Sequence, residues 1–583
     1  SYVTNRWCWA LAAACSYALV EVWPELSRPT RRQRIAVVAA SVAFIAAAFA
    51  LRNVTGDRNL FSLALLGIGA IVVAASSPIR RRLGARGFAL LAICLTAVGC
   101  VGMAHDLYAP RAKDYVDGFV DAGTAYARVA ESPFSQVPSD GRLSSPLAED
   151  GGADGGAQPV DFGRTEVTFG TPRERAWYFN ASALTGVPST QSYYSLSNGS
   201  VADLLKDMGI TDWLQFRYQN VGGRAALQAL MSVRYAILPA GRPVPEGFTQ
   251  VSSYSWQGGD YVILRNDDAL PFGFTYDAAL SPARYAELDA TDRQQALLDG
   301  VLLEGDGAAS AQDELAPADA TGTARTVPCS VETGDGVERT GTGSFTVSKA
   351  GARLTLRFQG SADAETYLVA KGTRVEPRSD IDPQESTWTA NRFRITVSTG
   401  SRETGDAVAR SFTYATPYSA YTLGQRDFVV NLGYAEEART ELTITFPEPG
   451  DYRFDELGVT CQPLGPIREA VAARGAEHLE NVRFQTNRVS GDISVEGTRA
   501  LFLSLPYDRG WTAYVDGRKV ELYRANRMGM ALMLDSGEHH VELRYETYGL
   551  RWGLAATGLG FAIFFVIALR WRNKKRRRGR IGA

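Results

Sequence analysis

The 583-residue sequence has no excess of either charge, since 61 Lys and Arg residues stand against 63 Asp and Glu residues, a formal net charge of −2. A nucleic-acid-binding protein normally shows a basic excess, so the balance argues against that class. Six cysteines are too few for a disulfide scaffold, and 21% charged residues beside 45% hydrophobic ones argue against a disordered chain. No Walker loop, Rossmann glycine run or Gly-x-Ser-x-Gly elbow is present.

What the sequence does contain is a set of five apolar segments almost without charge. Each has about 17 or 18 residues, close to the minimum for crossing a bilayer as a helix. Buried core helices are the alternative, but four such segments in the first 104 residues favour membrane spans. The predicted spans are 7–23, 35–51, 60–76, 87–104 and 552–569.

Basic clusters give the predicted spans an orientation. Arginines gather at 28–34 and 80–86, and Arg and Lys dominate the tail 570–583. The positive-inside rule assigns all three clusters to the cytoplasm. We therefore expect a multi-pass protein of the cell membrane, with residues 105–551 outside the cytoplasm and a cytoplasmic C-terminus. The length itself predicts several domains.

The exterior insert divides by pattern. Residues 105–160 predict an exit helix and a flexible linker rich in Ser, Pro, Gly and Asp. Mixed helix and strand signals over 161–325 predict an α/β domain, and short alternating strands over 326–465 predict a β-sandwich. Residues 466–551 predict a second β module with a lead-in helix. The predicted fold is a multi-domain membrane protein, an α-helical transmembrane bundle plus large extracytoplasmic α/β and β-sandwich-like domains.

Two cysteines fall in the exterior part, Cys329 near the first strand of the predicted sandwich and Cys461 after the last. The exterior is an oxidising setting, so we predict a disulfide between them, with two buried free thiols as the alternative. No metal site is expected. His539 and His540 lie near acids, but strand alternation sends consecutive side chains to opposite faces.

A turn near the C-terminus offers the candidate glycan contacts, because an aromatic ring beside a carboxylate suits a pyranose. These candidates are Tyr507, Asp508 and Trp511. In the alternative, Trp511 packs into the second β module and Asp508 fixes the turn by local hydrogen bonds. The Asp516–Gly517 pair between apolar runs predicts a type I′ hairpin turn.

Several strings carry a family resemblance. "LPYDRGWTAYVDGRKV" at 505–520, then Asn526 and "DSGEHHVELRY" at 535–545, resemble the C-terminal signature of YfhO-type bacterial membrane proteins. Upstream, "FNASALTGVPSTQSYYSLSN", "ALMSVRYAILP" (with Arg234 where Lys is common), "NDDALPFGFTYD" and "YVTNRW" resemble further segments of that family in the same order.

The resemblance implies a glycosyltransferase-C type protein. It would move a sugar from a polyprenyl-phosphate donor to a cell-envelope polymer such as teichoic acid, on the outer face of the membrane. In this type the catalytic acid sits on the first exterior loop. The sequence begins with Ser1 and its first methionine is Met103, so we expect that loop to precede it and assign no catalytic residue.

Two hypotheses remain open for the chain. In the first it belongs to such a transferase, lacks the catalytic half and is inactive alone; its partners are the membrane, the lipid-linked donor and the glycopolymer acceptor, with no nucleic acid and no evident cofactor. In the second it is a non-catalytic membrane-anchored envelope protein whose β modules bind surface glycan or a protein partner.

Overall fold

The computed structural model separates the chain into two compact units, Ser1–Ala125 and Tyr126–Ala583. Each unit is considered by itself. The residues described are 29–50, 60–116, 129–138, 143, 159–168, 180–194, 197–211, 213–214, 216–256, 258–320, 322–377, 391–400, 407–419 and 422–581.

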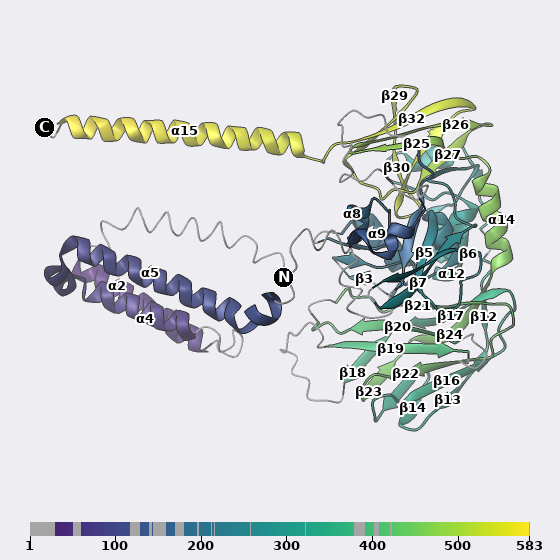
Figure 1. Ribbon diagram of the computed structural model, residues 1–583, viewed down its shortest axis with the longest axis horizontal. Coiled ribbons are helices and arrows are strands. Elements are labelled where there is room, and N and C mark those ends of the chain that lie inside the picture. Colours follow the sequence, from purple (N-terminus) through teal and green to yellow (C-terminus); the bar gives the residue numbers. More distant parts are fainter. Residues whose placement is uncertain are drawn as a thin grey trace. The chain divides into compact units, whose positions relative to one another are not determined.

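The described part of the first unit is helical (Figure 1), with α2 (Arg31–Ala50), α4 (Leu60–Ala74) and α5 (Ser76–Val116). The predicted spans at 35–51, 60–76 and 87–104 fall largely on these helices, while 7–23 lies outside the described residues. The stretch 77–86 between two of these predicted spans lies in α5, which is kinked at Gly84, where a φ of 69° leaves helical geometry and two helical stretches meet. Arg, Leu and Ala are good helix formers and fill most of this segment.

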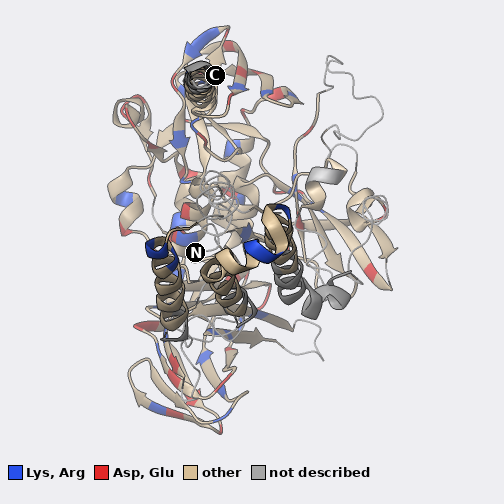
Figure 2. Cartoon of the chain, turned by 90° about the vertical axis from the view of Figure 1, so that its left-hand side faces the viewer, with Lys and Arg blue, Asp and Glu red and all other residues tan. Residues whose placement is uncertain are grey.

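One helix within the described residues is both long and apolar enough to cross a membrane, Leu550–Arg570. It is the first part of α15 (Leu550–Ile581) and covers the predicted span 552–569. By contrast, α4 has 15 residues, about 22 Å of helix, which falls short of a hydrocarbon core of about 30 Å. The bundle of four N-terminal spans therefore stays a prediction. In Figure 2 the bodies of the helices in the first unit are tan, with basic blue patches near their ends.

The second unit begins with a mixed four-stranded sheet of order β1-β5-β7-β6, in which β1 runs parallel to β5. The helices that the mixed pattern indicated are present, and Ser281 caps α11 by accepting a hydrogen bond from the Arg284 backbone N–H. The elements are η3 (Pro133–Gln136), β1 (Arg164–Val167), α8 (Ala181–Thr185), β2 (Ser192–Tyr193), α9 (Gly199–Asp207), β3 (Trp213–Leu214), β4 (Arg217–Tyr218), α10 (Ala225–Leu230), β5 (Val233–Pro239), β6 (Phe248–Trp256), β7 (Gly259–Asn266), β8 (Gly273–Tyr276), β9 (Ala278–Ala279), α11 (Pro282–Glu287), α12 (Ala290–Asp299), β10 (Leu303–Glu304), α13 (Ala308–Gln312) and β11 (Ala316–Pro317).

A central five-stranded sheet then joins two segments that the sequence predicted as separate domains. Its order is β10-β30-β31-β27-β8, so three strands from 466–551, among them β30 (Tyr523–Ala525) and β31 (Gly529–Leu534), lie between two strands from 161–325. On β27 (Arg499–Leu503), Phe502 enters the core shared with α9 to α12, whereas Leu501 and Leu503 enter the core of the last module. Because successive side chains of a strand point to opposite faces, this one strand supports both cores. The predicted division into a separate α/β domain and second β module therefore does not hold.

The region 326–465 forms β-sheets around one core of its own, as the alternating pattern predicted. Three sheets contribute, with orders β12-β24-β17-β21, β13-β16-β22-β19-β20 and β14-β15-β23-β18. The strands are β12 (Arg325–Val327), β13 (Cys329–Thr333), β14 (Val337–Gly341), β15 (Ser344–Val347), β16 (Arg353–Phe358), β17 (Ala364–Lys371), β18 (Arg374–Pro377), β19 (Arg392–Thr399), β20 (Val408–Ala415), β21 (Phe428–Ala435), β22 (Glu441–Thr445), β23 (Gly450–Arg453) and β24 (Glu456–Pro463).

The predicted disulfide between Cys329 and Cys461 is wrong, because both are free thiols. Cys461 is the register partner of Arg325 on β12, and Cys329 lies four residues beyond Arg325, about 13 Å further at the rise of a strand. A disulfide needs Cα atoms within about 7 Å. Cys461 is fully buried, and partial burial raises the pKa of the Cys329 thiol.

The last module is a sheet of order β25-β26-β32-β28-β29 that follows α14 (Leu464–Gly475), the predicted lead-in helix. Asp516 and Gly517 join β28 to β29 with φ angles of 51° and 78°, so the predicted type I′ turn is confirmed. The strands are β25 (Glu480–Gln485), β26 (Arg488–Val495), β28 (Trp511–Val515), β29 (Arg518–Val520), β30 (Tyr523–Ala525), β31 (Gly529–Leu534) and β32 (Gly537–Tyr545).

Candidate functional site

The predicted glycan-contact residues form a packed turn. Asp508 accepts a hydrogen bond at Oδ1 from the Gly510 N–H (2.8 Å), and its backbone oxygen accepts one from Trp511 N (3.2 Å). Trp511 packs on Tyr545, with ring centroids 5.0 Å apart. These are the contacts expected of the structural alternative, in which Asp508 fixes the turn and Trp511 joins the module. Glycan contact by Tyr507, Asp508 and Trp511 stays a prediction.

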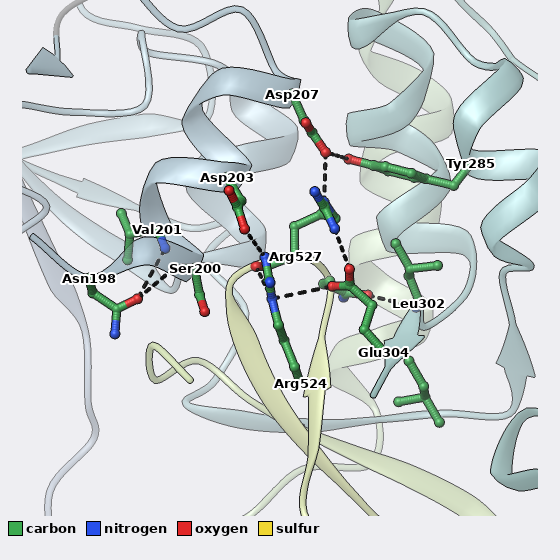
Figure 3. Close-up of polar contacts among 12 residues, drawn as sticks. Asn198, Ser200, Val201, Asp203, Asp207, Tyr285, Leu302, Glu304, Arg524 and Arg527 are labelled. Carbon is green, nitrogen blue, oxygen red and sulfur yellow. Dashed lines mark hydrogen bonds and ion pairs between the residues drawn. The ribbon is translucent and has the colours of Figure 1, made fainter. Parts of the chain in front are cut away.

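Tyr507 ties this turn to distant parts of the chain. Its backbone N–H donates to the Met528 oxygen (2.8 Å), and its own backbone oxygen accepts from Asn198 Nδ2 (3.0 Å). Asn198 also caps α9, because its Oδ1 accepts from the N–H groups of Ser200 and Val201 (Figure 3). The cap satisfies N–H groups that the first turn of a helix leaves unpaired.

Five charged side chains next to this cap form an ion-pair cluster, which we call the Arg clasp (Figure 3): Asp203, Asp207, Glu304, Arg524 and Arg527. Arg524 Nη2 lies 2.7 Å from Asp203 Oδ2, and Arg527 Nε lies 2.7 Å from Asp207 Oδ2. Both arginines also contact Glu304. Since α9 presents residues i and i+4 on one face, the two aspartates face the β30–β31 turn together.

Asn526, between the two arginines, is 1% exposed and adopts a φ of 49°. Its Oδ1 accepts from Leu302 N (2.9 Å), and its Nδ2 donates to the Tyr276 hydroxyl (3.0 Å). A buried amide that meets several partners fixes a single arrangement of its neighbours. The signature residue Asn526 therefore joins the β30–β31 turn to β8 and β10.

The carboxylates of the Arg clasp shift the pKa of Arg527 in the direction that keeps its ion pairs formed. Burial lowers the pKa of Arg527, but Glu304 and Asp207 outweigh it and the net shift is upward. Burial raises the pKa of Tyr285. The carboxylate of Asp207, which accepts a hydrogen bond from the Tyr285 hydroxyl (3.2 Å), raises this pKa further. Each carboxylate of the clasp is engaged by a guanidinium, so the cluster is suited to hold three segments together rather than to move protons.

The sequence offered a signal for the Arg clasp that the sequence analysis did not use. Two aspartates stand four apart on a predicted helix, and two arginines flank the signature residue Asn526. Their opposite charges are complementary, but the pairing spans 321 residues between Asp203 and Arg524. No local pattern specifies which distant charges meet.

A second feature is a polar groove of about 480 Å³ at the ends of β26 and β32, which we call the His groove. Its size falls within the range of small-ligand sites. It is lined by Ala476, Glu477, His478, Glu480, Asp492, Ile493, Ser494, Glu538, His539 and His540. Although His539 and His540 are consecutive on β32, both line the groove. Within the described residues no group of three or more His, Cys, Asp and Glu side chains could hold a metal ion.

The imidazoles of the His groove are held by carboxylates on either side of β32. His539 Nδ1 lies 2.8 Å from Asp516 Oδ2 and His540 Nδ1 lies 2.7 Å from Asp492 Oδ1. The Asp516 hydrogen bond raises the pKa of His539, and the same bond lowers the pKa of Asp516. The bond from His540 lowers the pKa of Asp492. The groove therefore presents ionised carboxylates and a protonation-prone imidazole.

Glu477 anchors the groove wall. Burial raises its pKa, but hydrogen bonds from the Thr275 hydroxyl and Arg499 Nε, both at 2.9 Å, outweigh burial and lower it overall. Glu480 and Glu538 line the groove on β25 and β32 and are exposed. Polar acceptors of this kind suit a hydroxyl-rich or amine-bearing ligand.

These features define a class, a β-rich body followed by an apolar helix able to cross a membrane. Residues 2–557 match the family described as "Bacterial membrane protein YfhO". The chain belongs to the YfhO family of bacterial membrane proteins, and the resemblance carried by the signature strings is confirmed.

The curated relative found is "Uncharacterized protein YfhO" of Bacillus subtilis (strain 168), 20% identical over 373 residues. The match covers 63% of this chain and 39% of that protein, so the chain spans well under half the length of its relative.

Solved structures give loose likenesses. A mutant of arabinofuranosyltransferase AftD from Mycobacteria superposes with a TM-score of 0.33 and 9% identity, over 93% of this chain and 72% of that one. The CBM22-1–GH10 modules of a Clostridium thermocellum xylanase superpose with a TM-score of 0.14 and 16% identity, over 24% and 26% of the two chains. Superpositions this loose carry no argument about the activity of this chain.

Proposed function

We propose that the chain is the acceptor-side part of a membrane-bound glycosyltransferase. It takes part in moving a sugar from a polyprenyl-phosphate carrier to a cell-envelope polymer such as teichoic acid, outside the membrane. The observation that carries the proposal is the YfhO match over residues 2–557, because the resemblance to that family implies a glycosyltransferase-C type protein.

The proposed membrane arrangement is multi-pass, with the basic clusters in the cytoplasm and residues 105–551 outside. Exposed apolar side chains on the described helices support it. Ile35 and Phe44 on α2, Ile71 on α4 and Ile93 on α5 are each more than 60% exposed. Apolar surface of this extent needs a nonpolar partner, and lipid would supply it.

In this proposal an uncharged, hydroxyl-bearing stretch of the acceptor polymer binds in the His groove, because the carboxylates that line the groove would repel phosphate groups. The lining carboxylates and imidazoles accept and donate hydrogen bonds, which matches a ligand dense in hydroxyl groups. No described residue is assigned to the transfer step itself. The exterior body binds and orients the acceptor. This raises the rate of transfer when the acceptor hydroxyl is held close to the donor sugar.

A transfer assay tests the proposal. Membranes of cells that express the protein from its own gene receive a radiolabelled polyprenyl-phosphate sugar and the envelope polymer, and incorporation of label is followed. The variant Glu480→Gln/Glu538→Gln loses two groove carboxylates, and we expect KM for the polymer to rise about tenfold, as for losing about 1.4 kcal/mol of hydrogen bonding. The value of kcat should be unchanged.

The matched control is Glu436→Gln/Glu437→Gln, which removes the same charge from two exposed positions after β21. It should leave both constants unchanged. Polymer binding without any label transfer in these membranes would contradict the enzyme proposal and favour a non-catalytic envelope protein. A raised KM in both variants would contradict the His groove as the acceptor site.

A further inference from the structure

The signature turn 505–511 lies directly beside the start of the apolar helix. β32 ends at Tyr545 and α15 begins at Leu550, so four residues link them. The Glu546 N–H donates to the Gly510 oxygen (3.0 Å). A side chain at Gly510 would place its Cβ 2.5 Å from the Glu546 oxygen, which is closer than real contacts allow. The turn and the link are therefore packed backbone against backbone.

Large aromatic and cationic side chains are exposed at this junction. Tyr548 is 70% exposed and Trp552 is 82% exposed. The Arg509 guanidinium stands over the Tyr548 ring, 5.8 Å from its centroid. Arg551 is paired with Glu546 at 2.5 and 2.6 Å, whereas Arg509 forms no ion pair with the residues that the structure describes. One cation without an ion-pair partner among the described residues therefore stands beside the exposed Tyr548 ring, and the exposed Trp552 follows four residues along the chain.

We propose that this junction is a membrane-surface contact, with Arg509, Tyr548 and Trp552 seated among phospholipid headgroups. We call these three residues the headgroup face. Trp552 belongs to the first turn of a 21-residue apolar helix of which nothing is buried in the protein. Tyr and Trp concentrate at the water interface of membrane spans, since their rings are apolar and their N–H or O–H groups are polar.

The positive charge of Arg509 then favours the phosphate groups of the lipid headgroups as its partner. A guanidinium binds phosphate through paired N–H donors, and a basic side chain is attracted to an anionic membrane surface. Because the backbones of Gly510 and Glu546 are hydrogen-bonded and closely packed, insertion of α15 brings Arg509 to the headgroups with it. The signature turn thereby fixes the height of the last β module above the bilayer. This inference does not depend on glycosyl transfer.

Photo-crosslinking in vesicles tests it. Arg509 is replaced with p-benzoylphenylalanine in the full chain, which is reconstituted into phosphatidylcholine vesicles with and without phosphatidylglycerol. Lipid adducts are then identified by mass spectrometry. The matched control is the same replacement at Arg518, an exposed arginine at the start of β29. Arg518 pairs with Val515 at the end of β28, about 13 Å from Trp511 along that strand.

We expect lipid adducts at position 509 at least tenfold above those at position 518. Equal yields at the two positions, or none at 509, would overturn the headgroup face. A second measurement keeps the native side chain: amide hydrogen exchange of 505–511 should be slower in vesicles with phosphatidylglycerol than without. Arg509→Glu should remove that difference while leaving thermal stability in detergent unchanged. A difference that survives Arg509→Glu would exclude the arginine as its cause.

Discussion

The guanidinium of Arg224 lies 5.5 Å from the ring centroid of Tyr367, across the boundary between the α/β part and the sandwich region. Arg224 is 1% exposed, and it donates from Nη1 to the Met208 oxygen (2.7 Å) and from Nη2 to the Val429 oxygen (2.6 Å). Glu365 accepts from the Tyr367 hydroxyl at 2.5 Å. Burial lowers the pKa of Arg224 and raises that of Glu365. The sandwich region is therefore fastened to its neighbour by a buried network.

Arg224→Ala should strongly destabilise the exterior body. It leaves the buried backbone oxygens of Met208 and Val429 without their donor, and each buried polar group left unpaired costs about 1–3 kcal/mol. The measurement is the thermal unfolding midpoint of the purified chain in detergent.

The control for Arg224 is Arg357→Ala. Arg357 binds Glu332 and Glu441 on the sandwich surface, and its side chain is 53% exposed, so its loss should change the unfolding midpoint little. Equal midpoints for the two variants would show that the Arg224 network contributes nothing to stability.

The Arg clasp should show energetic coupling between Asp207 and Arg527. The variants Asp207→Asn, Arg527→Met and the double variant form a cycle. Because the two side chains are about one-quarter exposed and 2.7 Å apart, we expect a coupling free energy of about 1–3 kcal/mol. Denaturant unfolding followed by tryptophan fluorescence measures it. Simple additivity of the two single losses would mean that the pair is not a stabilising contact.

The thiols give a direct chemical test. With both cysteines free, alkylation of the native protein should modify Cys329, which is partly exposed, while fully buried Cys461 should react only after unfolding. Peptide mapping by mass spectrometry without reduction identifies the modified sites. A peptide pair joined through Cys329 and Cys461 would contradict the arrangement of β12, β13 and β24.

Local chemistry made part of the fold predictable from sequence. The Asp516–Gly517 turn depends on two residues that tolerate positive φ, and Ser281 caps α11 through a contact three residues away. The central sheet was not predictable, because β27 pairs with β8 and the choice of that partner is made by packing between distant segments. The same holds for the contact of Asn198 with Tyr507, 309 residues apart. A signature string therefore indicated the family without indicating what its residues touch.

The His539–Asp516 pair should make stability depend on pH. Both ring nitrogens of His539 face acceptors, Asp516 Oδ2 and the Asp535 oxygen (3.0 Å), so the protonated ring is favoured and its pKa is raised. A group with a raised folded pKa contributes its full stabilisation below its ordinary pKa, about 6.5 for His, and loses it as the pH rises through the folded value.

The variant Asp516→Asn isolates the contribution of the His539–Asp516 ion pair to stability. Asn-Gly is equally suited to a type I′ turn, so only the charge of the side chain is lost. The pKa of Asp516 is itself lowered, so the carboxylate stays ionised at mildly acidic pH. The unfolding midpoint of the wild type should be higher than that of Asp516→Asn, and the difference should be largest near a pH of about 5–6. The two midpoints should converge as the pH rises through the folded pKa of His539. A difference that is constant from mildly acidic to alkaline pH would show that the turn, rather than the imidazolium, is responsible.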